Sequence, residues 1–264
     1  MKLNWKIKIW RYFIIAIVGL YLITPLYSMW DFSTKPFGAL KAERSFAAWK
    51  LIPSQPDLTI AIVRSLISAI IVMTIILVLI VPTLIWVQLK IPKLKRVFEL
   101  ICLLPLAIPA IVIVVGVAPL YRWISINLTE SPITLSLVYA MLILPFTYRS
   151  LAAAMDASDI HTLYEASRTL GASIPRMMIG VLMPTLRTGI INGSFIAIAL
   201  VLGEFTISNL LNYKTFQVVI AQLGRTNGVV AVAVSLGSIL FVLFLLMLIP
   251  QKKKTKLILD VDVD

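Results

Sequence analysis

The chain has 264 residues, of which 60% are apolar and only 14% are charged. A water-soluble domain of this length is about 45–50% apolar and about one quarter charged, so the composition argues against an ordinary soluble protein. The 24 Lys and Arg residues outnumber the 12 Asp and Glu residues, but they cluster between long uncharged stretches, which argues against a nucleic-acid-binding surface.

Six stretches of the sequence are long and nearly free of charge. Each holds about 18 or more residues, the length that an α-helix needs to cross about 30 Å of hydrocarbon. Runs such as Ile70–Leu77 are apolar on all sides, whereas a membrane β-barrel requires strict alternation of apolar and polar residues. We therefore predict an all-α membrane protein with six transmembrane helices, at about residues 10–30, 60–89, 98–120, 132–150, 187–212 and 228–250.

The first apolar stretch follows basic residues and resembles the start of a signal peptide. It is long, however, and Leu26–Met29 lacks a small-x-small cleavage pattern. We expect it to be retained, so that residues 1–58 form a first membrane helix and an irregular outer loop (31–58) rich in proline and charge. A transmembrane domain over 59–250 and a short tail over 251–264 complete the predicted organisation.

The distribution of positive charge predicts the orientation of the chain. When the segments outside the spans are numbered from the N-terminus, the odd segments hold 16 of the Lys and Arg residues and the even segments hold 8. Because cytoplasmic loops carry the excess of Lys and Arg, both termini are predicted to be cytoplasmic. The first outer loop is unusually basic, so this prediction depends mainly on the other loops.

Local residues predict the turns between the membrane helices and the breaks within them. Lys90–Arg96 is predicted to be a tight cytoplasmic turn, and Asn127–Pro132 and Tyr213–Asn227 are predicted to be outer turns. Proline removes a helix hydrogen bond, and Pro105 and Pro109 lie about one turn apart in the third span, a spacing that suits a moving or pore-lining helix. Cys102 cannot support a disulfide framework, because it is the only cysteine.

The segment 150–186 is the least membrane-like part of the predicted core. Ser158 or Asp159 is suited to cap the start of a helix, and Gly171 is suited to the left-handed conformation that ends one. Between them, Ile160, Leu163, Ser167 and Leu170 share one face at helical spacing, with Glu165 roughly opposite. Two interpretations stay open: a helix that docks in the groove of a partner, and a helix that lies on the membrane surface.

The same segment resembles a known protein family. Permease subunits of binding-protein-dependent ABC importers of the type I fold carry the pattern Glu-Ala-Ala, three residues, Gly, nine residues, Ile-x-Leu-Pro. This chain has Glu165-Ala166-Ser167, then Gly171, then Val181-Leu182-Met183-Pro184, with every spacing matched. Ser replaces the second Ala, Val replaces Ile and Met replaces Leu. The resemblance covers roughly residues 60–250 in topology and 150–212 in detail.

The resemblance implies that this loop forms the coupling helix of an importer in a bacterial cytoplasmic membrane. Its expected partners are a dimer of ATPase subunits, a second permease subunit (identical or a sister chain) and an extracytoplasmic substrate-binding protein. The chain itself would be no enzyme and hold no cofactor or metal, because ATP would be bound by the ATPase. The residues expected to couple to it are Leu163, Tyr164, Glu165, Ala166, Ser167, Leu170, Gly171, Ala172 and Pro184.

Residues inside the predicted membrane region suggest where a solute would pass. A carboxylate at Glu204, in the fifth span, is costly there and usually faces a cavity or a partner; it lies either near the interface, bonded to a neighbouring helix, or on the translocation path. The candidate path residues are Glu204, Asn192, Thr206, Asn209, Pro105 and Pro109. Arg64 can extend to the interface and His161 is expected at the surface, so neither receives a role.

Within the family, Arg168–Ser173 and Leu202–Phe205 resemble the branch that imports polyamines, ferric iron, thiamine, phosphonates or oxyanions. A membrane carboxylate favours a cationic cargo, so a polyamine such as spermidine or putrescine is the first expectation.

Three other classes compete with this interpretation. A secondary transporter would show an inverted repeat and paired broken helices, and no convincing repeat is found. A membrane enzyme would need motifs such as His-Glu-x-x-His or Gly-x-Ser-x-Gly, which are not in the sequence. An ion channel would have no use for the loop motif.

Overall fold

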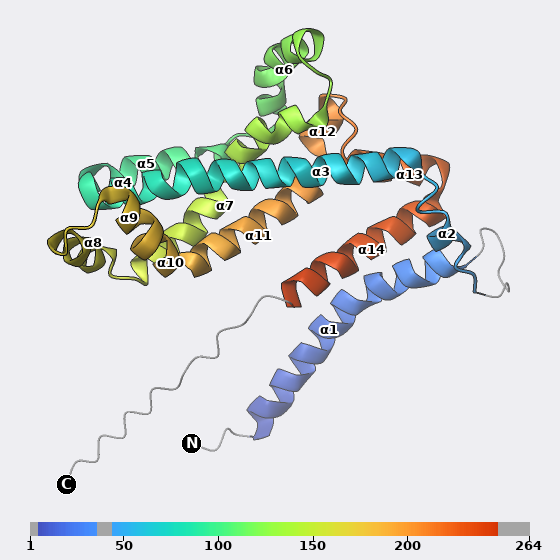
Figure 1. The fold of residues 1–264 in the computed structure, drawn as a ribbon. Coiled ribbons are helices and arrows are strands. Elements are labelled where there is room, and N and C mark those ends of the chain that lie inside the picture. The colour runs from blue at the N-terminus through green and yellow to red at the C-terminus, as the bar shows by residue number, and fades with distance from the viewer. Residues whose placement is uncertain (1–4, 36–43, 248–264) are drawn as a thin grey trace. The chain divides into compact units, whose positions relative to one another are not determined.

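The computed structural model describes residues 5–35 and 44–247, and within them it is helical with no strand (Figure 1). The predicted tail 251–264 and part of the predicted loop 31–58 lie outside the described residues. The α-helices are α1 (Trp5–Thr34), α2 (Ala47–Lys50), α3 (Pro56–Ile75), α4 (Val81–Lys90), α5 (Lys95–Leu103), α6 (Ala110–Asn127), α7 (Ser136–Asp156), α8 (Ile160–Thr169), α9 (Ile174–Met177), α10 (Met183–Thr185), α11 (Arg187–Gly203), α12 (Thr206–Leu210), α13 (Phe216–Thr226) and α14 (Gly228–Met247).

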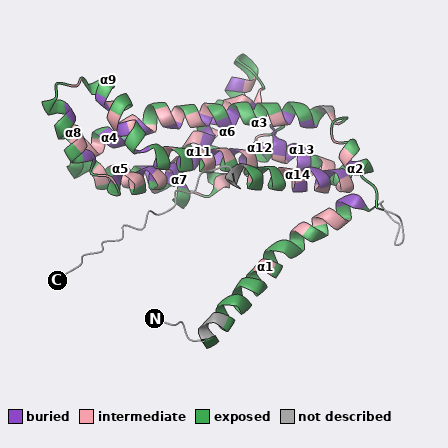
Figure 2. Cartoon of the chain, turned by 60° about the horizontal axis from the view of Figure 1, so that its bottom comes forward, coloured by how far each residue is buried: buried purple, intermediate pink, exposed green. Residues whose placement is uncertain are grey.

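Among the described residues, five helical stretches are long and apolar enough to cross a membrane: Ile9–Thr34, Asp57–Lys90, Ala110–Asn127, Pro132–Asp156 and Arg187–Leu210. A sixth apolar helix in the described part of the chain, Gly228–Phe244, is shorter. Many large apolar side chains are exposed, including nearly the whole length of α1 (Figure 2). Water penalises an apolar surface of this extent, whereas lipid does not, and the chain is therefore a multi-pass all-α membrane protein.

The contacts divide the chain into two units, residues 1–50 with 227–264 and residues 51–226. They thus group α14 with α1, whereas the sequence pattern had assigned it to the central segment 59–250. Gly237 on α14 faces α2, where a Cβ at this position would lie 3.6 Å from the Trp49 ring, in ordinary van der Waals contact. Close approach through small residues is the usual way in which membrane helices pack.

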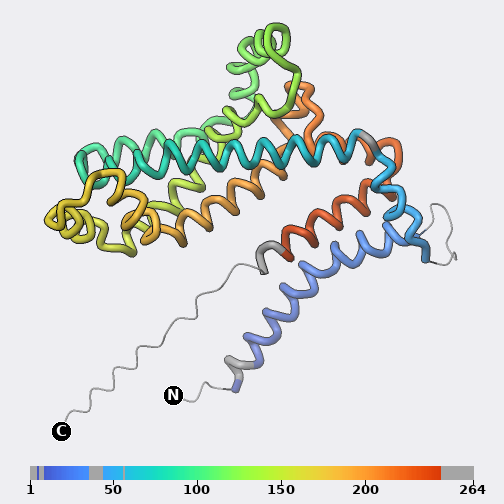
Figure 3. Tube along the Cα trace, in the orientation of Figure 1, coloured from blue at the N-terminus to red at the C-terminus, as the bar shows by residue number. Residues whose placement is uncertain are grey.

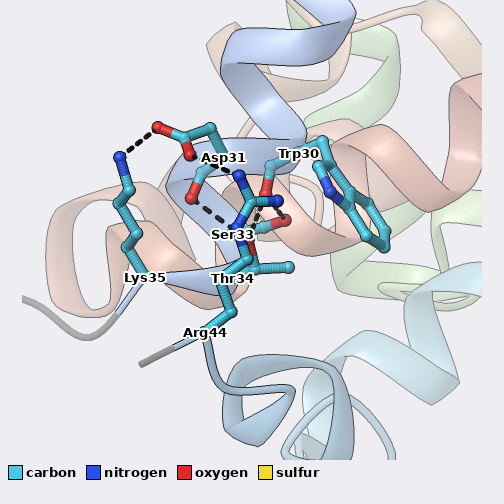
Figure 4. Close-up of polar contacts among 6 residues, drawn as sticks. All are labelled: Trp30, Asp31, Ser33, Thr34, Lys35 and Arg44. Atoms are coloured by element: carbon cyan, nitrogen blue, oxygen red, sulfur yellow. Dashed lines mark hydrogen bonds and ion pairs between the residues drawn. The ribbon is translucent and has the colours of Figure 1, made fainter. Parts of the chain in front are cut away.

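Polar contacts fix the end of α1 within the first unit (Figure 4). The Asp31 carboxylate accepts a hydrogen bond from Arg44 at 3.3 Å and also pairs with Lys35. The backbone N–H of Ser45 donates to the Thr34 carbonyl at 2.7 Å, and Trp49 Nε1 donates to Ser33 Oγ at 3.3 Å. The predicted irregular loop therefore begins after a helix that continues to Thr34.

The second unit is built around one long helix and a close helix pair. Asp57–Lys90 is continuous (Figure 3), with a π-helical segment, Ile76–Ile80, that ends two residues before Pro82. Such a segment accommodates a proline without breaking the helix. Next to it, α7 and α11 pack side by side, and Gly189 on α11 lets Ser150 Oγ donate to its carbonyl at 3.0 Å.

The third span, predicted at about 98–120 with interruptions at Pro105 and Pro109, is divided in the structure. Helix α5 ends at Leu103, a 3₁₀ turn covers Leu104–Ala107, and Ile108 is extended before α6 begins at Ala110. Pro105 and Pro109 cause this break, because neither can donate a backbone hydrogen bond. The stretch long enough to span a membrane is consequently displaced to Ala110–Asn127.

One of the three predicted connections differs from its prediction. The segment Tyr213–Asn227, predicted as a turn, contains the 11-residue helix α13. Its apolar residues, from Phe216 to Ile220, are buried mainly against α3, and the backbone N–H of Phe216 donates to Ser65 Oγ at 3.0 Å. The predicted turns at Lys90–Arg96 and Asn127–Pro132 are confirmed by the ends of α4 and α6.

Candidate functional site

Helix α8 is the centre of the segment that the sequence singled out. Its start is capped by Asp159, whose carboxylate accepts hydrogen bonds from the Thr162 backbone N–H at 3.1 Å and from the Thr162 hydroxyl at 2.7 Å. Its end is followed by Gly171 at φ 75°, the left-handed conformation that glycine adopts without strain. Of the two predicted capping residues, Asp159 is the one used, and the predicted role of Gly171 is confirmed.

The apolar side of α8 packs against its own chain. Ile160 is 2% exposed and belongs to a core that also contains Leu151, Met177 and Leu182. Ser167 is buried on the same side, and its Oγ donates to the Leu163 carbonyl at 2.7 Å. This face is therefore occupied by the second unit itself and is not free to dock with a partner.

Leu170 does not share a face with Ile160 and Ser167, contrary to the prediction from helical spacing. It follows the last helical residue, where the turn into Gly171 directs it outward, and it is 86% exposed. Ala172, by contrast, packs partly against the core. The segment thus presents one large, isolated apolar side chain at the end of α8.

The outward face of α8 carries Glu165 and Ala166, both exposed. No Lys or Arg among the described residues forms an ion pair with Glu165. Tyr164 is turned toward its own chain, where the Lys90 ammonium lies 4.9 Å from the centre of its ring. Glu165, Ala166 and Leu170 are therefore the coupling candidates that remain accessible on α8.

An apolar pocket of about 600 Å³ lies beside α8. It is lined by α4 residues such as Trp86, by Tyr164 and by methionines from α9 to α10, Met177, Met178 and Met183. Pro184, the last residue of the sequence motif, is exposed on α10. A π-helical segment, Met178–Leu182, directly precedes it, which again places a π turn before a proline within a continuing helix.

The N-terminal cap makes α8 sensitive to acid. Hydrogen bonds from Thr162 lower the pKa of the Asp159 carboxyl below its ordinary value of 3.8, so its stabilisation is complete above that value and is lost as the pH falls through the lowered pKa. We predict that Asp159→Ala speeds amide hydrogen exchange at Thr162 at neutral pH, whereas Asp159→Asn, which keeps an acceptor, has a smaller effect. Equal exchange in all three proteins would contradict the capping role.

The predicted translocation residues are only partly brought together. Pro105, Glu204 and Thr206 line one pocket of about 450 Å³. Asn192 and Asn209 are exposed elsewhere on α11 and α12, and Pro109 precedes α6; these three do not line it. The pocket is a hollow of mixed character between the break before α6 and the break after α11.

Glu204 serves as a cap in this structure. Its carboxylate accepts hydrogen bonds from the Ile207 backbone N–H at 2.7 Å, from the Ser208 backbone N–H at 3.2 Å and from Ser208 Oγ at 3.1 Å. Its own backbone is extended between α11 and α12. The charge is thus compensated by the N-terminus of α12, as expected for an anion at that end of a helix.

Tyr139 lines the same pocket and was not anticipated. It is 2% exposed, and within the described part of the chain its hydroxyl has no hydrogen-bond partner. The sequence signal was a lone hydroxyl within an otherwise apolar stretch of the fourth span, which does not distinguish a ligand contact from ordinary packing.

Comparison with known proteins does not identify a function, so any functional assignment depends on the residues of this chain. No model of a known protein family matches the chain, and no curated protein matches its sequence. In the described residues, no group of three or more His, Cys, Asp or Glu side chains is placed to hold a metal ion.

Proposed function

We propose that this chain is a permease subunit of an ATP-driven importer, with six membrane spans, cytoplasmic termini and α8 as its coupling helix. One observation carries the proposal: a rigidly anchored helix presents Glu165 and Leu170 outward at the positions where the Glu-Ala-x-x-x-x-Gly motif lies. Its anchoring is supported by Asp159 at the start, Gly171 at the end and Ile160 in the core.

The mechanics follow from this anchoring. A helix whose buried side belongs to the same core as α4 and α7 moves with those helices, because packed interiors transmit displacement and deform little. A partner that grips the outward face of α8 would therefore move the membrane helices joined to it. In this proposal, an ATPase dimer supplies the movement, and a second permease subunit completes the path.

The structure changes the argument about the cargo. A polyamine was expected because a carboxylate inside the membrane region favours a cationic cargo. Glu204 accepts three hydrogen bonds at the start of α12, which hold its carboxylate toward that helix and weaken the preference for a cationic cargo. The importer function is proposed without that preference.

A crosslinking experiment tests the proposed partner. We predict that a photoreactive amino acid at Leu170 forms an adduct with an ATPase subunit that carries Gly-x-x-x-x-Gly-Lys-Ser/Thr, the phosphate-binding loop, because Leu170 is 86% exposed at the end of α8. The same group at Leu128, 68% exposed at the end of α6, is the matched control. An ATPase adduct from Leu128 and none from Leu170 would refute the assignment of α8.

A further inference from the structure

A further pocket lies away from α8 and was not anticipated from the sequence. It has a volume of about 780 Å³ and is formed within the second unit by the end of α6, the turn before α7 and the chain after α12, with Arg64 reaching it from α3. We call it the basic pocket, because three of its lining residues are Arg64, Arg122 and Lys214 and only one, Glu130, is acidic.

The two arginines of the basic pocket are not neutralised by the described part of the protein. Lys214 pairs with Asp57 at 3.2 Å, but no carboxylate in residues 5–35 or 44–247 forms an ion pair with Arg64 or Arg122. Each guanidinium offers a planar set of donors that matches the oxygens of a carboxylate, phosphate or sulfate. The pocket therefore has the charge and the donors for an oxyanion.

The wall of the pocket is well fixed. Asn212 adopts φ 60°, a conformation that Asn tolerates better than most residues, and this turn brings Tyr213 and Lys214 to the pocket. The rings of Tyr213 and Tyr121 pack edge-on, with their centres 6.1 Å apart. The Tyr121 hydroxyl donates a hydrogen bond to the Thr134 carbonyl at 3.0 Å. These contacts fix the two tyrosines on one side of the pocket, whereas the basic side chains are exposed at its mouth.

Tyr213 supplies an independent sign of a ligand site. It is 7% exposed, and its hydroxyl has no hydrogen-bond partner among the described residues. A buried hydroxyl without a partner is uncommon and costs stability, so such groups are often found where a structure binds something else. Here the residue lines the basic pocket.

The position of these charges also calls for an explanation. The predicted orientation places Arg64, Arg122 and Lys214 at the outer face, where membrane proteins carry fewer basic residues. A hollow lined by one sign of charge raises the local concentration of the opposite ion. The Glu204 carboxylate is hydrogen-bonded to the start of α12, whereas the basic pocket carries three basic side chains and one acidic one.

We propose that the basic pocket binds an oxyanion through Arg64 and Arg122. The source of the oxyanion is either a free solute, such as a phosphate, phosphonate or sulfate, or the phosphate of a lipid headgroup. If it is a solute, the pocket would receive an anionic cargo; that consequence rests on the proposed function, whereas the binding itself does not.

The test uses the full chain alone, in nanodiscs of zwitterionic lipid, with inorganic phosphate as the probe and ³¹P line broadening as the readout. We expect saturable binding that is weakened by about tenfold or more in Arg64→Gln/Arg122→Gln, because each charged hydrogen bond is worth more than a neutral one. Arg225→Gln, an exposed arginine on α13 outside the pocket, is the matched control and should bind as the unaltered chain does.

A second arm distinguishes the sources. Native mass spectrometry of the same proteins in nanodiscs containing phosphatidylglycerol would show retained anionic lipid, lost in the double variant, if a headgroup is the ligand. Arginine-dependent binding in either arm supports the proposal. No saturable binding in both arms, or an equal loss in Arg225→Gln, overturns it. Failure of the crosslink at Leu170 would leave this result unaffected, so the two proposals fail separately.

Discussion

Glu165→Lys is expected to reduce ATP-dependent uptake by about 30-fold or more, because the loss of a central interface residue costs about 2 kcal/mol or more. Glu165 is exposed on the outward face of α8 and forms no ion pair with the described residues. Its replacement therefore leaves the internal packing of α8 intact. The measurement is the initial rate of solute uptake by the assembled transporter, together with the amount of ATPase subunit that copurifies.

Asp156→Lys is the matched control for this prediction. It reverses the same charge in the same segment 150–186 but lies outside α8, and its pair with Lys95, at 3.2 Å, is exposed on both sides. Exposed pairs contribute little to stability, so near-normal uptake is expected. Normal uptake by the Glu165→Lys protein would contradict the coupling role, whatever the control does.

Gly189→Ala is expected to be strongly destabilising, although alanine is ordinarily the better helix former. A Cβ at this position would lie 2.5 Å from the Ala154 Cβ and 2.9 Å from the Ser150 carbonyl oxygen. Helices α7 and α11 would have to separate, at a cost of about 1–3 kcal/mol for overpacking and about 1 kcal/mol for the Ser150 hydrogen bond. The thermal unfolding midpoint in detergent measures the loss.

Gly116→Ala provides the matched control, because a Cβ on this α6 residue would meet nothing within 4 Å. Its stability is expected to stay the same or to rise by up to about 1 kcal/mol. Adding Ala154→Gly to the Gly189→Ala protein should restore part of the loss. Equal stability of the two single variants would contradict the close approach of α7 and α11.

Short-range sequence signals predicted the two ends of α8 correctly. Asp159 and Gly171 were predicted because capping and left-handed turns are decided by one or two residues. Leu170 was assigned to the wrong face because the helical spacing was applied to it although α8 ends one residue earlier, at Thr169. An amphipathic pattern gives the face of a residue only while the helix lasts.

Features that depend on distant parts of the chain were not accessible in the same way. The capping role of Glu204 requires the break between α11 and α12, which apolar composition across 187–212 conceals. The third span was predicted too early because Pro105 and Pro109 shift the start of the helix to Ala110. The basic pocket joins Arg64, Arg122 and Lys214 from three separate segments, a convergence that no local pattern contains.

Reconstitution tests the central claim most directly. Proteoliposomes that contain this chain, its sister permease where one exists, the ATPase subunits and the binding protein are expected to accumulate solute only when ATP is supplied on the side that α8 faces. Omission of the ATPase should abolish accumulation. Solute accumulation by vesicles that hold this chain alone, without nucleotide, would contradict the account.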